Sequence, residues 1–167
     1  MGKRLHALSR GEDFRRISTD PGMKSISAET TFDVDISDRE ALEAHLWRLA
    51  VRVADRAKAK ETTGRVITVK LKTRDFKTVT RQAAQDAPTN LADTIFKEGR
   101  ALLALVLSKA PFRLIGVGIS DLTDEAVGSS VDLFDPNAAS RAKAEKASDI
   151  IRNRFGADAI VKGRSLK

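Results

Sequence analysis

Residues 65–82 read RVITVKLKTRDFKTVTRQ, and the pattern of this segment is the strongest indication of the fold class. Apolar and polar side chains alternate in its first half: the apolar set is Ile67, Val69 and Leu71, and the polar set is Thr68, Lys70 and Lys72. A period of two is typical of a strand that is covered on one face only. A turn at Arg74 and Asp75 leads into residues 76–85, which we expect to form the second strand of a hairpin.

The segments around this hairpin predict two further strands and two helices. Residues 24–36 are rich in threonine and alternate in polarity, which predicts a half-buried strand. Residues 38–61 place leucine, valine and alanine at helical spacing, after a cap at Ser37 or Asp38. We expect a second helix at 91–108, after Pro88-Thr89-Asn90 has stopped the hairpin strand, and a last apolar strand at 112–120.

The predicted order is therefore strand, helix, strand, strand, helix, strand. Lys70, Lys72 and Arg81 indicate that one face of the sheet is solvated, so both helices should cover the other face. We predict an α+β fold (β-α-β-β-α-β): a four-stranded, antiparallel-type mixed sheet with two helices on one face, an N-terminal helical tail and a C-terminal helix.

Turn residues and changes in composition divide the chain into four parts. Residues 1–22 contain a short helix at 2–10 and the start of a linker, and residues 23–122 form the folded domain. Residues 123–137 are a second linker, and residues 138–167 are a helical tail. The tail helix, predicted at 138–155 with Gly156 as its stop, carries a thin apolar stripe of Ala144, Ala147, Ile151 and Phe155.

The composition favours a polyanionic partner. The 167 residues include 30 Lys and Arg against 23 Asp and Glu, which gives a net charge of +7 and a sequence pI near 9.9. Cysteine is absent, which excludes disulfides and a thiol nucleophile. No apolar run is long enough to cross a bilayer and no signal-peptide core is present, so we expect a soluble, monomeric, cytoplasmic protein without a membrane partner.

The residue types offer little for catalysis. The two histidines, His6 and His45, are far apart, so neither a clustered histidine metal site nor a histidine-based triad is available. Gly116-Val117-Gly118 lacks the third glycine of a dinucleotide site, and close packing within a strand accounts for it. Two groups of carboxylates could hold magnesium, although solvation at loop edges explains them equally well: Asp33 with Asp35, and Asp121 with Asp124 and Glu125. We predict no catalytic residue, metal site or cofactor in this chain.

The predicted hairpin is basic and rich in hydroxyl groups. Asp75 is its only acid, and its cations are Lys70, Lys72, Arg74, Lys77 and Arg81. Ammonium, guanidinium and hydroxyl groups bind phosphate oxygens without reading bases. An ordinary solvated sheet face explains the pattern equally well. Tyr is absent and the one Trp lies in a predicted helix, so stacking platforms for single strands are poorly supplied and duplex backbone is the favoured target.

Three segments resemble one known family in the right order along the chain. Residues 24–32 (KSISAETTF) resemble the opening segment of the little finger domain of Y-family, DNA polymerase IV-like enzymes. Residues 75–81 (DFKTVTR) resemble the middle hairpin of that domain, and residues 112–120 (FRLIGVGIS) its last strand. Residues 2–16 resemble the end of the preceding thumb region, through Leu5, Leu8 and Gly11.

The resemblance implies a non-catalytic domain that lies along duplex or primed DNA while the palm of a translesion, error-prone polymerase performs nucleotidyl transfer. Matching positions imply phosphate contacts by Lys24, Ser25, Thr80, Arg81, Arg113 and Ser120. Charge and strand parity add Lys70, Lys72 and Arg74. The palm carboxylates that bind Mg in the family lie upstream of the thumb, so we expect a polymerase as the parent protein and no enzyme in these residues.

The sequence departs from the family pattern at several positions. Ser27 stands where glycine is usual, and Leu114 and Gly118 stand where some members carry basic residues. Family members also bind the sliding clamp through a Gln-Leu-x-Leu-Phe-like peptide. The nearest candidate is 130–134 (SVDLF), in which Val131, Leu133 and Phe134 would contact the clamp but Ser130 replaces the glutamine. A hydrophobic staple for the following helix explains these residues equally well.

Two other classes of protein compete with this interpretation. A free-standing RNA-binding module with a basic sheet face needs exposed aromatic residues on its central strands, where this sequence has Thr, Lys and Arg. An enzyme in its own right needs a convergent set of acid, base or metal ligands, which the sequence does not supply.

Overall fold

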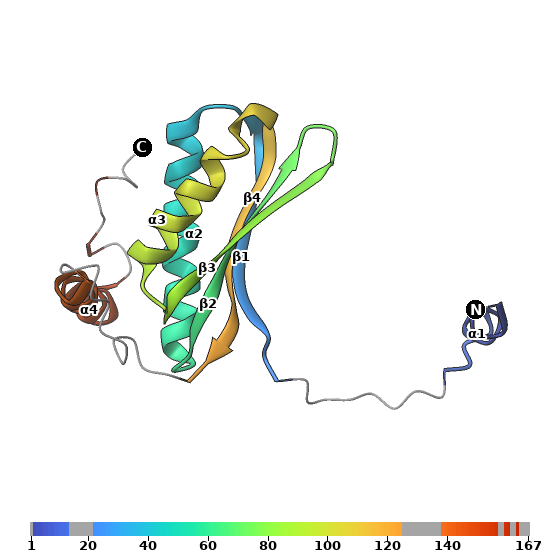
Figure 1. Ribbon diagram of the computed structural model, residues 1–167, viewed down its shortest axis with the longest axis horizontal. Helices are drawn as coiled ribbons and strands as arrows, with labels where there is room; N and C mark the ends of the chain where they lie inside the picture. The colour runs from blue at the N-terminus through green and yellow to red at the C-terminus, as the bar shows by residue number, and fades with distance from the viewer. Residues whose placement is uncertain (1, 14–21, 125–137, 157–158, 161–162, 164–167) are drawn as a thin grey trace.

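The computed structural model describes residues 2–13, 22–124, 138–156, 159–160 and 163 (Figure 1). The elements, in chain order, are α1 (Gly2–Ser9), β1 (Ser25–Ile36), α2 (Arg39–Ala59), β2 (Thr63–Thr73), β3 (Thr78–Thr89), α3 (Ala92–Ala104), the 3₁₀ turn η1 (Leu107–Lys109), β4 (Phe112–Thr123) and α4 (Ala138–Phe155). The predicted β-α-β-β-α-β order is confirmed, with a helix on either side of it.

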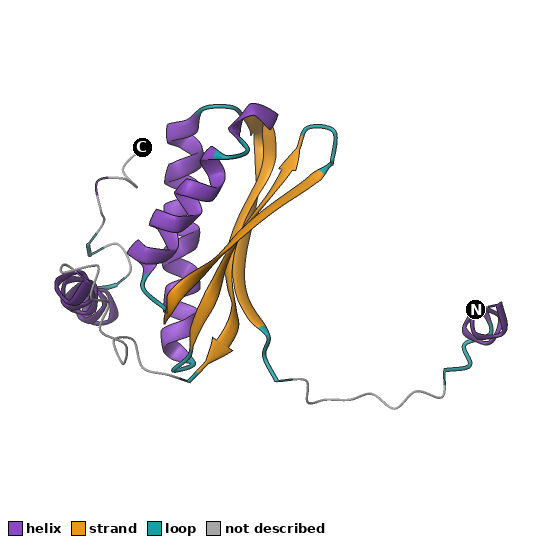
Figure 2. Cartoon of the chain, in the orientation of Figure 1, coloured by secondary structure: helices purple, strands orange, loops and turns teal. Residues whose placement is uncertain are grey.

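One four-stranded sheet carries the domain. Its strands lie in the order β1-β4-β2-β3, and all three pairings are antiparallel, so the described sheet contains no parallel pair. Helices α2 and α3 lie side by side on one face, and no helix of the described residues packs on the opposite face (Figure 2). The predicted fold class is confirmed.

The apolar face predicted for β2 is the face that packs against the helices. Ile67, Val69 and Leu71 are almost completely buried, together with Ile115, Val117 and Ile119 of β4. From the helices, Leu42, Leu46, Leu49, Val53, Ile95 and Leu103 fill the same core. Each such side chain contributes about 1.5–3 kcal/mol when fully buried. The two helices also contact each other through the rings of Trp47 and Phe96, whose centroids are 5.4 Å apart.

Local signals set the beginning of α2. The Asp38 carboxylate accepts a hydrogen bond from the backbone N–H of Ala41 at 2.7 Å, so Asp38 and not Ser37 is the cap. Further along the helix, the ring of His45 lies 4.7 Å from that of Phe32, and burial, followed by the charge of Arg48, lowers the pKa of His45.

Three predicted boundaries are wrong. Strand β3 continues through Pro88 to Thr89, because it is an edge strand in which a residue without an N–H is tolerated. Its pairing with β2 is interrupted between the pairs Gly64/Thr89 and Val66/Ala84. Helix α3 ends at Ala104 and is followed by the η1 turn, and β4 extends to Thr123.

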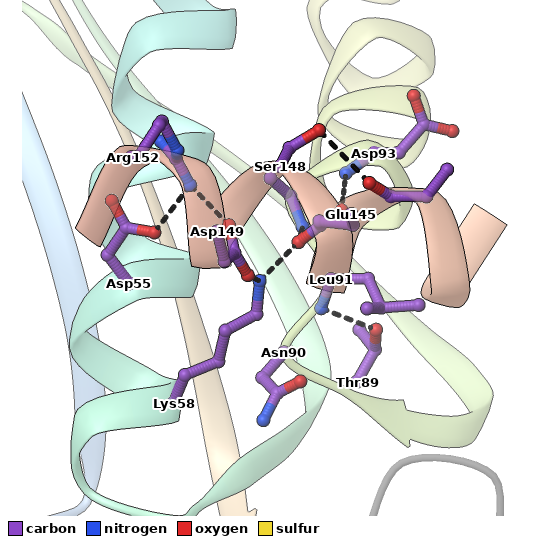
Figure 3. Close-up of polar contacts among 12 residues, drawn as sticks. Asp55, Lys58, Thr89, Asn90, Leu91, Asp93, Glu145, Ser148, Asp149 and Arg152 are labelled. Carbon is purple, nitrogen blue, oxygen red and sulfur yellow. Dashed lines mark hydrogen bonds and ion pairs between the residues drawn. The ribbon is translucent and has the colours of Figure 1, made fainter. Parts of the chain in front are cut away.

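Helix α4 contacts the domain through charged side chains (Figure 3). The Lys58 ammonium of α2 donates to Glu145 and to Asp149, both at 2.6 Å, and Arg152 pairs with Asp55 at 3.1 Å. The predicted stripe does not form the contact: Ile151 and Phe155 are exposed. No helix in the described part of the chain is long and apolar enough to span a membrane.

Candidate nucleic-acid interface

The register defines the sheet surface that the helices leave uncovered, which we call the open face. Side chains directly opposite one another in an antiparallel sheet share a face, and faces alternate along each strand. In the order β1, β4, β2, β3 the open face has four rows: Ser25, Ser120, Val66 and Ala84; Ser27, Gly118, Thr68 and Gln82; Glu29, Gly116, Lys70 and Thr80; Thr31, Leu114, Lys72 and Thr78.

Two glycines leave the middle of the open face without side chains on β4. A Cβ atom added at Gly118 would lie 2.7 Å from Cβ of Ser27 and 3.0 Å from the carbonyl oxygen of Ile26. One added at Gly116 would lie 2.9 Å from Cβ of Glu29. Both glycines are therefore required for the close approach of β1 to β4, as the sequence predicts. In the second row, the side chains on either side of Gly118 are those of Ser27 and Thr68.

The cations gather toward the hairpin end of the open face. Lys70 lies in the third row, where its ammonium contacts Glu29 Oε2 at 2.9 Å, and Lys72 lies in the fourth. Beyond the fourth row, Cζ of Arg113 lies 4.0 Å from the centroid of the Phe76 ring. The exposed turn residues Arg74 and Lys77 lie next to this ring in sequence. Positive charge is thus concentrated at one end of a surface otherwise made mostly of small and hydroxyl-bearing side chains.

Five of the nine predicted contact residues lie on the open face, spread over three of its rows. Ser25 and Ser120 share the first row, Lys70 and Thr80 the third, and Lys72 lies in the fourth. Lys24 directly precedes β1 and is exposed. Arg113 lies where the pairing of β4 with both neighbours shifts register, and Arg74 lies in the turn, where its N–H donates to the carbonyl of Pro111 at 3.3 Å.

The prediction that Arg81 lies on the solvated face with Lys70 and Lys72 is wrong. Arg81 is paired with Val69, a core residue, and so lies on the helix side of the sheet. It remains exposed because β3 is an edge strand, and its guanidinium donates to the carbonyl of Thr80 at 2.8 Å. Alternation along β3 carried this signal, since Arg81 is two residues from Val79, which packs against the core.

Two further residues of this surface are not among the predicted contacts. Glu29 is the one acidic side chain in the four rows and holds the Lys70 ammonium. Phe76 is an exposed ring beside two cations, which the sequence alone assigns only to a strand start. The signal for Glu29 was its place in the alternation of β1, on the same face as Ser25 and Ser27.

Within the described residues, no three His, Asp or Glu side chains are grouped so that they could hold a metal ion. Neither Asp33 with Asp35 nor Asp121 with Asp124 is therefore part of such a group there. The predicted clamp-contacting residues Val131, Leu133 and Phe134, like Glu125, lie outside the described residues.

Known structures share this architecture. A Y-family DNA polymerase chimera aligns with a TM-score of 0.54 at 18% identity, covering 71% of this chain and 34% of that chain. A post-insertion binary complex of Dbh DNA polymerase aligns with a TM-score of 0.53 at 16% identity, covering 72% and 35%. The fold is thus that of a domain found in Y-family DNA polymerases.

Residues 23–133 match the model of the impB/mucB/samB family C-terminal domain, and the chain belongs to that family. It contains the little finger domain of the Y-family, DNA polymerase IV-like kind. It is 47% identical over 163 residues to a DNA polymerase IV of Brucella melitensis, covering 98% of this chain and 37% of that protein. It is 43% identical over 166 residues to a DNA polymerase IV of Caulobacter vibrioides, covering 99% and 41%. The chain thus spans about two fifths of the length of these relatives.

Proposed function

We propose that this chain is a non-catalytic module of a translesion DNA polymerase and that its open face grips the backbone of the template–primer duplex. The observation that carries the proposal is a sheet face that α2 and α3 leave uncovered, with at least one hydroxyl side chain in each of its four rows and with cations at its hairpin end. Within this module we take residues 23–122 as the DNA-binding domain.

The chemistry of the open face suits phosphate and not bases. Lys70, Lys72 and Arg113 supply positive charge, and Ser25, Thr80 and Ser120 supply hydroxyl donors. Such groups fix a protein on a duplex without carrying sequence information. The rows contain no aromatic side chain on the central strands β4 and β2, so the stacking platform of an RNA-binding sheet is missing from them.

A matched pair of variants tests which surface binds. We expect Lys70→Ala combined with Lys72→Ala to weaken binding to a primed duplex about ten-fold or more in 0.1 M salt, since each lost phosphate contact removes a charge-assisted bond. Lys143→Ala combined with Lys146→Ala removes the same charge from two exposed positions of α4 and should change affinity less than about two-fold. Equal losses in both variants would mean that binding follows net charge and not the open face.

Catalysis belongs to the remainder of the parent polymerase in this proposal. The family resemblance implies palm carboxylates that bind Mg upstream of the thumb, and the relatives that carry the name DNA polymerase IV are about two and a half times as long as this chain. The chain alone should incorporate no deoxynucleotide into a primed template with magnesium, and a purified preparation that did so would contradict the proposal.

We also propose that Leu133 and Phe134 dock in an apolar groove of the sliding clamp, with Val131 beside them. Short docking peptides draw most of their affinity from a few buried apolar anchors. Because Ser130 replaces a glutamine, binding should be weak and should depend on tethering at a shared DNA end. Titrating the clamp into the wild-type chain and into the Leu133→Ala, Phe134→Ala double variant tests this, since identical titrations would leave the helix staple as the role of these residues.

A further inference from the structure

The turn between β2 and β3 holds an exposed aromatic ring beside two cations. Phe76 is 65% exposed, and the centroid of its ring lies 4.0 Å from Cζ of Arg113 and 5.9 Å from Nζ of Lys72. Lys72 comes from β2 and Arg113 from β4, so the ring gathers cations from two neighbouring strands. This hairpin end is at the upper right of Figure 1, where it projects away from the helices.

The backbone holds Phe76 in a conformation that bulky residues avoid. Its φ is +61°, in the left-handed region that favours glycine. Its N–H donates to the carbonyl of Thr73 at 2.9 Å, and the N–H of Thr73 donates to the carbonyl of Lys77 at 2.9 Å. Because the ring is mostly exposed, burial in the core does not account for a phenylalanine at this strained position.

The contact with Arg113 has a direct consequence for phosphate binding. A guanidinium stacked on a ring keeps the N–H groups at its edges available, and those edges bind a phosphate in a two-pronged manner. A side chain that is already ordered by stacking also loses less conformational entropy when it binds.

We propose that Phe76 is a positioning residue for DNA binding: its ring holds the Arg113 guanidinium, and more weakly the Lys72 ammonium, where they meet a phosphate of the duplex. The inference rests on the proposed function, because it assumes that the open face and its hairpin end bind DNA. Phe76 carries no charge, so in this proposal it acts on DNA only through the two cations that its ring holds.

The test compares three replacements of Phe76 in the whole chain by fluorescence anisotropy on a labelled primed duplex. Phe76→Leu keeps the apolar character but removes the π face, and we expect a loss of affinity of about two- to five-fold. Phe76→Tyr and Phe76→Trp restore a ring and should bind within about two-fold of wild type. The slope of log K against log salt should become shallower in Phe76→Leu by up to about 0.9, the value of one phosphate contact.

A second exposed phenylalanine provides the matched control. Phe155 of α4 is 69% exposed, and its ring centroid lies 5.4 Å from Cζ of Arg154. It belongs to α4, which contributes no residue to the open face. Phe155→Leu should leave DNA affinity unchanged. Urea unfolding of each variant separates a loss of fold from a loss of binding.

The decisive comparison repeats Phe76→Leu in a Lys72→Ala, Arg113→Ala background. If the ring acts through these cations, the replacement changes affinity no further there. A similar loss in that background would mean that the ring touches DNA itself and would overturn the inference. If Phe76→Leu left the DNA affinity of the otherwise wild-type chain unchanged, the inference would also be overturned, but the proposed function would stand. A wild-type chain without DNA affinity would overturn both.

Discussion

Among single residues, the choice of side chain at position 27 depends on the residue at position 118. Ser27 and Gly118 face each other across β1 and β4, and the Cβ that Gly118 lacks would lie 2.7 Å from Cβ of Ser27. Ser27 fits at its position because its partner, Gly118, has no side chain.

We therefore predict that Gly118→Ala lowers the free energy of unfolding by about 1–3 kcal/mol, the typical cost of overpacking. Ser27→Gly in the same chain should recover part of the loss, though not all, because the added Cβ also lies 3.0 Å from the carbonyl oxygen of Ile26. Urea unfolding of the single and double variants gives the coupling. Purely additive effects would contradict a contact between the two side chains.

The pair Glu29 and Lys70 predicts a gain of function. Glu29 Oε2 lies 2.9 Å from Nζ of Lys70, and both side chains are about half exposed. Such a pair adds little to stability, but the carboxylate competes with phosphate for the ammonium. Glu29→Gln should therefore raise DNA affinity by up to about five-fold, with no more than a small change in stability. Affinity that stays the same or falls would mean that Lys70 does not bind phosphate.

At the scale of elements, α4 supplies a cap that α3 lacks. The residue before α3, Leu91, has no side chain that can accept a hydrogen bond from the first turn. Glu145 of α4 replaces it: Oε1 accepts from the N–H of Ala92 at 2.8 Å and Oε2 from the N–H of Asp93 at 3.4 Å (Figure 3). Lys58 pairs with the same carboxylate, so α4 joins the end of α2 to the beginning of α3.

Glu145→Ala should lower the free energy of unfolding by about 1 kcal/mol, as the loss of a helix cap does. The exposed neighbour Lys146 provides the control, and Lys146→Ala should be neutral within about 0.5 kcal/mol. Calorimetry or urea unfolding measures both. If the two variants were equally stable, the carboxylate of Glu145 would have no capping role.

The contact of α4 with α2 also predicts that stability depends on pH, through Asp149. Burial acts to raise the pKa of Asp149, but hydrogen bonds from Lys58 and Arg152, with their charges, outweigh it and lower that pKa. The stabilisation from Asp149 is therefore present above its unfolded pKa and lost as the pH falls below about 4. Asp55 acts in the opposite direction, since burial, its largest influence, raises its pKa.

Because the two groups oppose each other, the informative quantity is the difference between wild type and Asp149→Asn. The variant should be less stable than wild type at pH 7, and the gap should close as the pH falls from about 4 to 2. Hydrogen exchange at the amides of α4, followed across this range, would show whether the closing gap corresponds to release of that helix. A gap that is constant with pH would contradict the assigned pairing.

At the scale of the whole molecule, sequence predicted what depends on local pattern and missed what depends on the neighbours of an element. Alternation in β2 predicted the buried and open faces. Ser37 and Asp38 predicted a cap before α2, and the structure shows that Asp38 forms it. The length of β3 could not be predicted, because Pro88 is tolerated only on an edge strand and strand order is not local. The docking of α4 could not be predicted either, because its contacts are charges that pair with residues about 90 positions away.

The candidate site divides in the same way. The sequence shows that the hairpin is rich in basic and hydroxyl-bearing residues. The register of the sheet then brings Ser25, Lys70, Thr80 and Ser120 to one face. The predicted position of Arg81 is wrong: its charge favours the solvated face, but its parity with Val79 puts it on the helix side of the sheet. The cluster of Phe76 with Arg113 required the fold, since the two residues come from different strands.

If the open face binds duplex backbone, DNA affinity should depend strongly on salt concentration. Binding of the chain to labelled duplexes of different sequence should be measured from about 0.05 to 0.3 M salt, with and without Lys70→Ala and Lys72→Ala. We expect equal affinity for all sequences, with log K falling linearly against log salt at about −0.9 per neutralised phosphate, and a slope shallower by about 1 for each lysine removed. An affinity that does not change with salt, or a slope unaffected by both substitutions, would contradict binding by the open face.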